Sequence, residues 1–207
     1  MNKRHIAGLF LLGLVTVNSS LAQKSIIQIQ LPDPNGRLKA ASTGVMLGSQ
    51  GTLAFGPSVK NSSPIKALGQ DSAVFQVTRL AGQDALTGLV LLLWDRAPGE
   101  SAQVAPGVSL GQGVKVVEAR EPQQLHSEQA SVSSVEEVPG YGPVFYVKTT
   151  SPAGSLVMEG SALIGVLSPV SGKEGIMVIS AARVAQIQST KEEYATWAST
   201  YRLMIRF

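Results

Sequence analysis

Short apolar runs separated by turn residues fill most of the chain between residues 26 and 179. Clusters rich in Gly, Pro and Ser separate these runs, as at 48–51, 111–113 and 139–143. Many short strands at near-regular spacing are typical of an all-β sandwich or barrel. One run is apolar without a break, which indicates a strand buried on both faces. The predicted strands are Ile26–Gln30, Gly44–Leu47, Thr52–Phe55, Ile65–Leu68, Val74–Leu80, Leu89–Trp94 (the unbroken run), Val114–Ala119, Val144–Thr149, Leu156–Met158, Leu163–Pro169 and Ile176–Ile179.

Helical patterns occur only near the C-terminus. A first short helix is predicted over Ala181–Gln188. Thr190 has the character of an N-cap, and Glu193 three residues later completes a capping box. A second helix is therefore predicted from Lys191 to about Thr200.

Three aromatic residues lie on this second predicted helix. Tyr194, Trp197 and Tyr201 are spaced by three and four residues, so they would share one helical face. That face either packs on the protein's own barrel or contacts a partner. Both interpretations remain open from the sequence.

The first 22 residues have the three-part pattern of a secretory signal peptide. Lys3 and Arg4 form a basic start, and Ile6–Val17 is an apolar run of twelve residues. A membrane span needs about 20 apolar residues, so this run is too short for an anchor helix. Small residues precede a predicted cut between Ala22 and Gln23. We therefore expect a periplasmic or secreted protein with no transmembrane span after cleavage.

Composition removes several classes of chemistry. The chain has no Cys, which excludes disulfides, thiolate metal sites and a Cys nucleophile. Loss of Lys3 and Arg4 with the leader reduces 17 basic residues to 15, against 14 acidic residues. That balance gives no basic footprint for nucleic acid.

Metal and cofactor sites are also not expected. His126 is the only histidine of the predicted mature chain, and its polar surroundings predict a solvated loop. The acidic pairs at 136–137 and 192–193 lack the spacing of a calcium loop. The glycines at 107, 111 and 113 are not followed by the βαβ unit of a dinucleotide site.

Taken in order, the segments resemble trypsin-like serine proteases of the bacterial HtrA (Deg) type. For the first barrel of that family, the similar segments are Ser42–Leu47, Gly51–Val59, Asp71–Val77 and Ala81–Leu92. For the second barrel, they are Val108–Val117, Thr150–Val157, Gly160–Val166 and Gly175–Gln188. Each motif alone has low specificity, whereas their order and spacing together are more specific.

The resemblance implies an all-β fold, a trypsin-like double antiparallel β-barrel with a C-terminal helix. The implied organisation is a signal peptide at 1–22, an N-terminal strand and linker at 23–41, a trypsin-like domain at 42–188 (barrels at about 42–106 and 107–180, then a short helix), and a helical extension at 189–207.

The resemblance also assigns positions to the catalytic triad, and all three carry other residues. Ser58 stands at the His position, Gly88 at the Asp position and Pro152 at the Ser position. Serine is no base near neutral pH, glycine has no side chain, and proline lacks both a hydroxyl and a backbone N–H. We therefore expect no serine-protease activity.

The expected function is binding of a protein or peptide in the bacterial envelope without catalysis. Trypsin-like folds bind extended peptides as an added strand, and the resemblance places that surface near Gly160–Val166 and Ser168–Gly172. The alternatives are a structural or assembly subunit without a ligand cleft and, less favoured, a hydrolase with a relocated site. The sequence does not identify the partner or the oligomeric state.

Overall fold

The computed structural model describes residues 24–32, 35, 37–48, 51–56, 66–68, 74–121 and 124–189. The predicted signal peptide, Ser58 and the extension with Tyr194, Trp197 and Tyr201 lie outside the described residues. No helix in the described part of the chain is long and apolar enough to cross a membrane.

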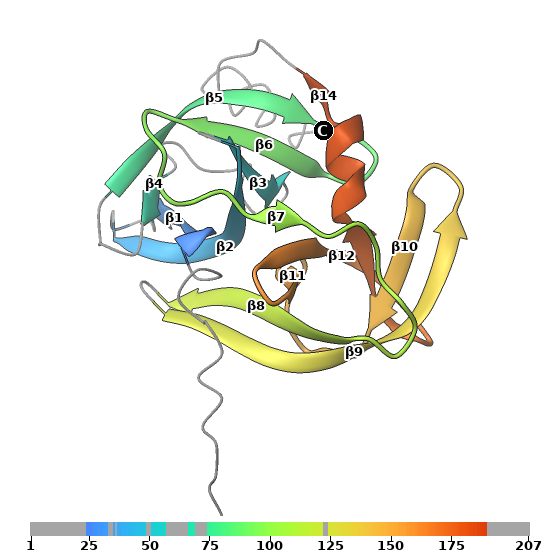
Figure 1. The fold of residues 1–207 in the computed structure, drawn as a ribbon. Helices are drawn as coiled ribbons and strands as arrows, with labels where there is room; N and C mark the ends of the chain where they lie inside the picture. The colour runs from blue at the N-terminus through green and yellow to red at the C-terminus, as the bar shows by residue number, and fades with distance from the viewer. Residues whose placement is uncertain are drawn as a thin grey trace, which may run out of the picture.

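Six antiparallel strands close a first barrel (Figure 1). Their order around the ring is β5-β4-β1-β2-β3-β6, and pairing of β5 with β6 completes it. The predicted start of the domain at Ser42 falls within β2, and the strand that precedes it pairs with both β2 and β4. The first barrel thus includes the strand assigned to an N-terminal segment. The strands are β1 (Ile26–Pro32), β2 (Leu38–Leu47), β3 (Gly51–Phe55), β4 (Lys66–Leu68), β5 (Val74–Gln83) and β6 (Leu89–Trp94).

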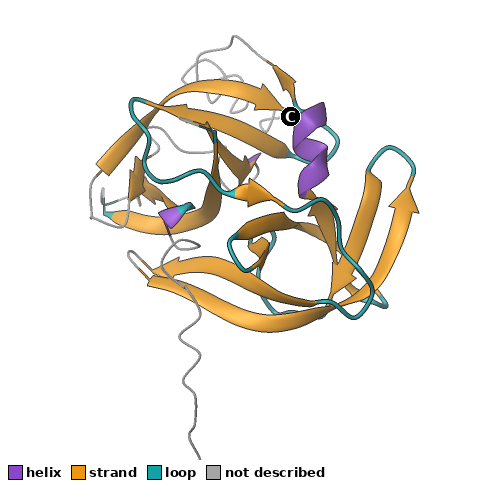
Figure 2. Cartoon of the chain, in the orientation of Figure 1, coloured by secondary structure: helices purple, strands orange, loops and turns teal. Residues whose placement is uncertain are grey.

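The second sheet forms a ring in the order β11-β8-β9-β10-β13-β12, and pairing of β12 with β11 completes it. A short strand of the linker between the sheets adds to β12 in parallel. The two antiparallel barrels predicted from the sequence are therefore confirmed (Figure 2). The strands are β7 (Gln103–Val104, in the linker), β8 (Gly113–Glu121), β9 (Gln124–Val138), β10 (Gly142–Val147), β11 (Leu156–Glu159), β12 (Ala162–Gly172) and β13 (Gly175–Ser180).

The chain then crosses from the second barrel back to the first. The helix predicted over Ala181–Gln188 is a 3₁₀ helix, η1 (Ala181–Gln186), followed by a strand, β14 (Gln188–Ser189). The first backbone amides of a helix lack partners within it. The Ser180 hydroxyl accepts one of them, from Ala182, at 3.3 Å. β14 pairs antiparallel with the end of β5, so the segment after β13 connects the two barrels (Figure 1).

Three apolar clusters organise the core. One fills the first barrel around Trp94, and another fills the second around Phe145. The third draws buried residues from both barrels and joins them into one body. Its members include Val45, Leu53, Phe55, Leu89, Val117, Leu156, Met158, Leu163, Val166, Ile179 and Ala181.

The longest strand, β9, was not predicted. It spans 15 residues, of which only Val132 is fully buried. His126 lies on this strand, half-buried and opposite Glu118 of β8. The prediction of a solvated loop histidine was therefore wrong. The segment is held by backbone pairing to β8 and β10, which its polar composition does not reveal.

Candidate functional site

The segment that the resemblance aligns with the nucleophile is an ordered turn between β10 and β11. The Ser155 amide and hydroxyl both donate to the Pro152 carbonyl, at 3.1 and 2.8 Å. Gly154 donates to the Leu167 carbonyl at 2.8 Å, and the Leu167 amide donates back to Ser155 at 2.9 Å. Gly154 has a φ of 90°, a left-handed conformation that glycine adopts readily. These bonds fix the turn firmly against β12.

Pro152 is exposed at this turn. Proline offers neither a hydroxyl to attack a carbonyl nor an N–H to stabilise an oxyanion. The neighbouring Ser151 is only 2% exposed, and its hydroxyl has no hydrogen-bond partner among the described residues. An inaccessible hydroxyl cannot take over the role of a surface nucleophile.

Gly88, which the resemblance aligns with the catalytic Asp, occupies the end of a tight turn after β5. Its φ is 76°, in the left-handed region that residues with a β-carbon adopt only with strain. Its amide donates to the Asp84 carbonyl at 2.8 Å, and its own carbonyl accepts the Gly56 amide at 2.7 Å. Gly56 follows β3 directly and precedes Ser58 by two residues. The structure thus brings Gly88 beside the end of β3, while the position of Ser58 itself is not described.

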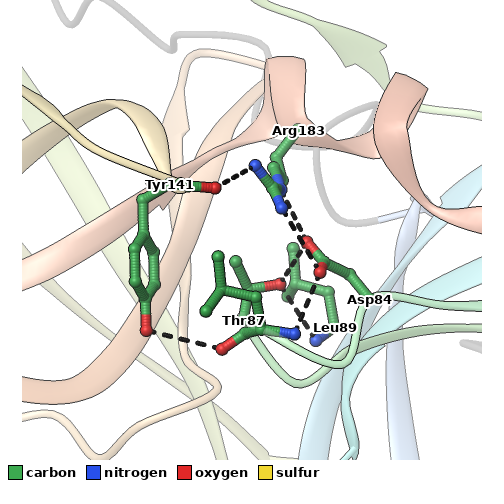
Figure 3. A network of polar contacts seen from close by, with 7 residues as sticks. Asp84, Thr87, Leu89, Tyr141 and Arg183 are labelled. Atoms are coloured by element: carbon green, nitrogen blue, oxygen red, sulfur yellow. Dashed lines mark hydrogen bonds and ion pairs between the residues drawn. The ribbon is translucent and has the colours of Figure 1, made fainter.

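A carboxylate does lie in the same turn, at Asp84 (Figure 3). Thr87 Oγ donates to it at 2.8 Å, and the Leu86 amide donates at 3.1 Å. Arg183 of η1 donates through Nε at 2.6 Å and through Nη2 at 3.4 Å. The side chains of Asp84 and Arg183 are 7% and 13% exposed, so this ion pair is largely shielded from water.

The surroundings of Asp84 keep it charged. Burial alone would raise the pKa of the carboxyl, but the hydrogen bonds from Arg183, Thr87 and Leu86, with the charge of Arg183, outweigh burial and lower it. The hydrogen bond to Asp84 raises the pKa of the Arg183 guanidinium, against a smaller opposing effect of burial. Asp84 is therefore an ionised structural acceptor occupied by an arginine, and no described histidine is bonded to it.

Arg183 also bonds to the second barrel. Its Nη1 donates to the carbonyl of Gly140, at the tip of the β9–β10 hairpin, at 2.6 Å. The next residue, Tyr141, donates its hydroxyl to the Leu86 carbonyl at 3.4 Å. One guanidinium thereby links η1, the turn after β5 and the hairpin (Figure 3). Neither Arg183 nor Tyr141 was singled out from the sequence, because no local pattern marks partners so far apart in the chain.

The stretch of β12 after Leu167, next to the Pro152 turn, is irregular. Ser168 is 3% exposed, and its hydroxyl accepts the backbone amide of Val170 at 3.1 Å. Pro169, between them, has no amide to donate. Pairing of β12 with β13 is irregular across this stretch, between Leu167 and Ser171.

The space between the barrels near these positions is apolar. Phe55 and Leu89, which flank the Gly56–Gly88 contact, belong to the shared cluster. Ala153, next to Pro152, packs against the same cluster from the other barrel. Among the described residues, no group of three or more His, Cys, Asp or Glu side chains could hold a metal ion.

Comparison with solved structures identifies the architecture. The chain superposes on the HtrA-type protease AlgW with decapeptide with a TM-score of 0.67 at 13% identity, covering 82% of this chain and 65% of that one. For the serine endoprotease from Yersinia pestis the TM-score is 0.65 at 16% identity, covering 80% and 62%. For the active form of the Rv3671c protease from M. tuberculosis it is 0.68 at 15% identity, covering 84% and 87%.

The chain has the fold of trypsin-like serine proteases. It spans less than two thirds of the length of the first two of these structures. No family model matches the chain, and no curated protein matches it. The trypsin-like fold expected from the order of the motifs is therefore confirmed by structure alone, at identities that carry no information on activity.

Proposed function

We propose that this chain is a non-catalytic trypsin-like protein, a pseudoprotease of the bacterial cell envelope, that acts by binding a protein or peptide. The observation that carries the proposal is Pro152, exposed in an ordered turn that the resemblance aligns with the nucleophile. The turn is built and held by four hydrogen bonds, so the fold is retained while the reactive group is absent.

The Asp position supports the same proposal. The left-handed φ of Gly88 favours glycine, and both backbone groups of this residue are already bonded. The only carboxylate of that turn is held by Arg183, an arrangement that stabilises structure and orients no catalytic base. These hydrogen bonds keep the turn folded without a catalytic group, as expected of a protein that binds without catalysis.

The envelope location rests on the predicted cut after Ala22. Lys24 begins the described structure, and its carbonyl accepts the Glu100 amide at 3.0 Å. Its ammonium pairs with the Glu100 carboxylate at 3.0 Å. A cut between Ala22 and Gln23 would remove neither these contacts nor any described strand of the first barrel. Mass measurement of the N-terminus of the exported protein tests this part.

Catalysis is tested with fluorescently labelled casein and a fluorophosphonate serine probe. The matched variants are Pro152→Ala, which leaves the turn without a nucleophile, and the triple variant Ser58→His, Gly88→Asp, Pro152→Ser. We expect no turnover and no labelling of the wild type or of Pro152→Ala. Labelling of the triple variant would show that only side chains separate the chain from a protease. Turnover by the wild type that Pro152→Ala leaves unchanged would instead favour a hydrolase with a relocated site.

Binding is tested by crosslinking in envelope extract with residues 23–207, beside a chain that ends at 190. A protein retained by both chains would place binding on the barrels. A protein lost with the deletion would move it to the extension that carries Tyr194, Trp197 and Tyr201. Self-association with no other protein retained would contradict the binding function and favour the structural subunit.

A further inference from the structure

The hairpin formed by β9 and β10 is held differently at its base and at its tip. At the base, Val144 and Phe145 are buried, and Phe145 belongs to the core of the second barrel. Toward the tip the side chains are exposed or half-buried throughout residues 135–143. The outer part of this hairpin therefore has little apolar burial of its own, which is the character of a segment that opens at low cost.

Two polar contacts fasten this tip to the first barrel. Arg183 donates to the Gly140 carbonyl at 2.6 Å, and the Tyr141 hydroxyl donates to the Leu86 carbonyl at 3.4 Å. The first bond is short and charge-assisted, whereas the second is near the limit of a hydrogen bond. The Asp84 carboxylate accepts from Nε and Nη2 of Arg183 and so holds the guanidinium in place. Of the two contacts, the one made through the Asp84–Arg183 pair is therefore the stronger.

The tip can move as a unit because it is closed on itself. The Tyr141 amide donates to the Val138 carbonyl at 2.9 Å. Gly140 and Gly142, with φ of 83° and 75°, provide the left-handed residues of the turn. None of these features requires contact with the first barrel.

We propose that the Asp84–Arg183 pair is a latch that fastens the tip of the β9–β10 hairpin over the turn 84–88. Release of the pair frees the tip and loosens the turn, while both barrels stay folded. The turn ends at Gly88 and Leu89, and Leu89 packs in the apolar cluster between the barrels. The latch therefore controls how tightly the turn that leads into this cluster is held. This inference rests on described contacts and does not depend on the proposed binding function.

The test compares hydrogen exchange of the wild type with Arg183→Met, which keeps an unbranched apolar side chain but removes every donor. Asp84→Asn is a second, nearly isosteric variant. Arg79→Met is the matched control, because Arg79 is exposed on β5 and makes the same change of side chain outside the turn and the hairpin. We expect the amides of 84–88 and 138–142 to exchange about tenfold faster or more in both latch variants. Amides of β6 and β8 should be unchanged, and the control should match the wild type.

A distance measurement gives an independent readout. The chain has no Cys, so Ala85→Cys with Glu137→Cys places two spin labels at exposed sites without side reactions. We expect one narrow distance distribution with the latch intact and an added longer population with Arg183→Met. Unchanged distances and exchange would overturn the latch. Equal acceleration of exchange in β6, β8 and the hairpin would also overturn it, since the pair would then act only on global stability.

Discussion

The hydroxyl of Ser168 accepts the backbone amide of Val170 at 3.1 Å, across a proline that has no amide. This edge of β12 follows the point where Leu167 is bonded to the Pro152 turn. A peptide added as a strand is held by alternating N–H and C=O groups of the edge. Here Pro169 has lost one donor, and the Val170 amide is already occupied. An extended peptide that met this stretch would find neither a Pro169 nor a Val170 amide free to donate.

We expect the wild type to bind a fluorescent, unstructured casein peptide with a Kd weaker than about 1 mM. Ser168→Ala with Pro169→Ala frees one amide and adds another. Adjacent amides of an extended strand point to opposite sides, so one of the two would face an added peptide, and one net hydrogen bond of about 0.5–1.5 kcal/mol makes binding about two- to tenfold tighter for the double variant. Fluorescence anisotropy measures it, with Pro143→Ala, an exposed proline of β10, as control. Saturable micromolar binding by the wild type would contradict the argument.

A second prediction concerns the backbone at the Asp position. Gly88→Ala places a β-carbon on a residue with a φ of 76° and should destabilise the protein by about 1–2 kcal/mol. Gly88→Asn should cost less, because asparagine tolerates this conformation. Urea unfolding measures both. Gly107→Ala is the control, since a β-carbon there meets nothing within 4 Å, and it should change stability by less than about 0.5 kcal/mol. Equal losses in Gly88→Ala and Gly107→Ala would count against strain at Gly88.

The sequence predicted the strands whose side chains are apolar and buried. β3 and β6 are nearly all apolar, and every residue of β3 is buried. β9 was missed because its stability comes from backbone pairing on two sides, while its side chains are polar and mostly accessible. A hydrophobic pattern indicates which positions are buried, so it does not reveal a long barrel strand whose side chains are mostly accessible to water.

The candidate site was likewise predicted only in part from the sequence. The order of the motifs led to Gly88 and Pro152, both of which lie in hydrogen-bonded turns of the structure. Asp84 lies within the segment Ala81–Leu92 that resembles the protease family, but its partner Arg183 is 99 residues away in the chain. Such a pairing follows from the closure of both barrels and the return of η1 to the first, which no local pattern contains. The irregular pairing of β12 after Leu167 likewise has no marker in the hydrophobic pattern.

A third prediction concerns the core of the first barrel. The indole N–H of Trp94 donates to the Thr52 hydroxyl at 2.7 Å, and both residues are buried. Thr52→Val removes this acceptor at nearly constant volume and leaves a buried donor without a partner, a loss of about 1–3 kcal/mol. Thr52→Ser keeps the hydroxyl and should lose less. Guanidinium unfolding followed by circular dichroism measures the difference. A Thr52→Val protein at least as stable as Thr52→Ser would show that the hydrogen bond contributes nothing net.

The last prediction is the pH dependence of the latch. The pKa of Asp84 is lowered in the folded protein, whereas in the unfolded chain it is about 3.9. The Asp84 carboxyl therefore binds fewer protons in the folded protein than in the unfolded chain, and the stability that it contributes is complete above the unfolded pKa. That stabilisation is lost as the pH falls through the unfolded value toward the lower, folded one.

We expect the stability difference between wild type and Asp84→Asn to be constant from about pH 5.5 to 7 and to shrink toward pH 3. Urea unfolding across this range measures it, and subtraction of the variant removes the contribution of the other carboxylates. Arg183→Met should weaken this pH dependence, because it takes away the hydrogen bonds and charge of Arg183 that lower the Asp84 pKa, while those from Thr87 and Leu86 remain. A difference that grows as the pH falls would reverse the sign and would mean that burial, rather than Arg183, dominates the titration of Asp84.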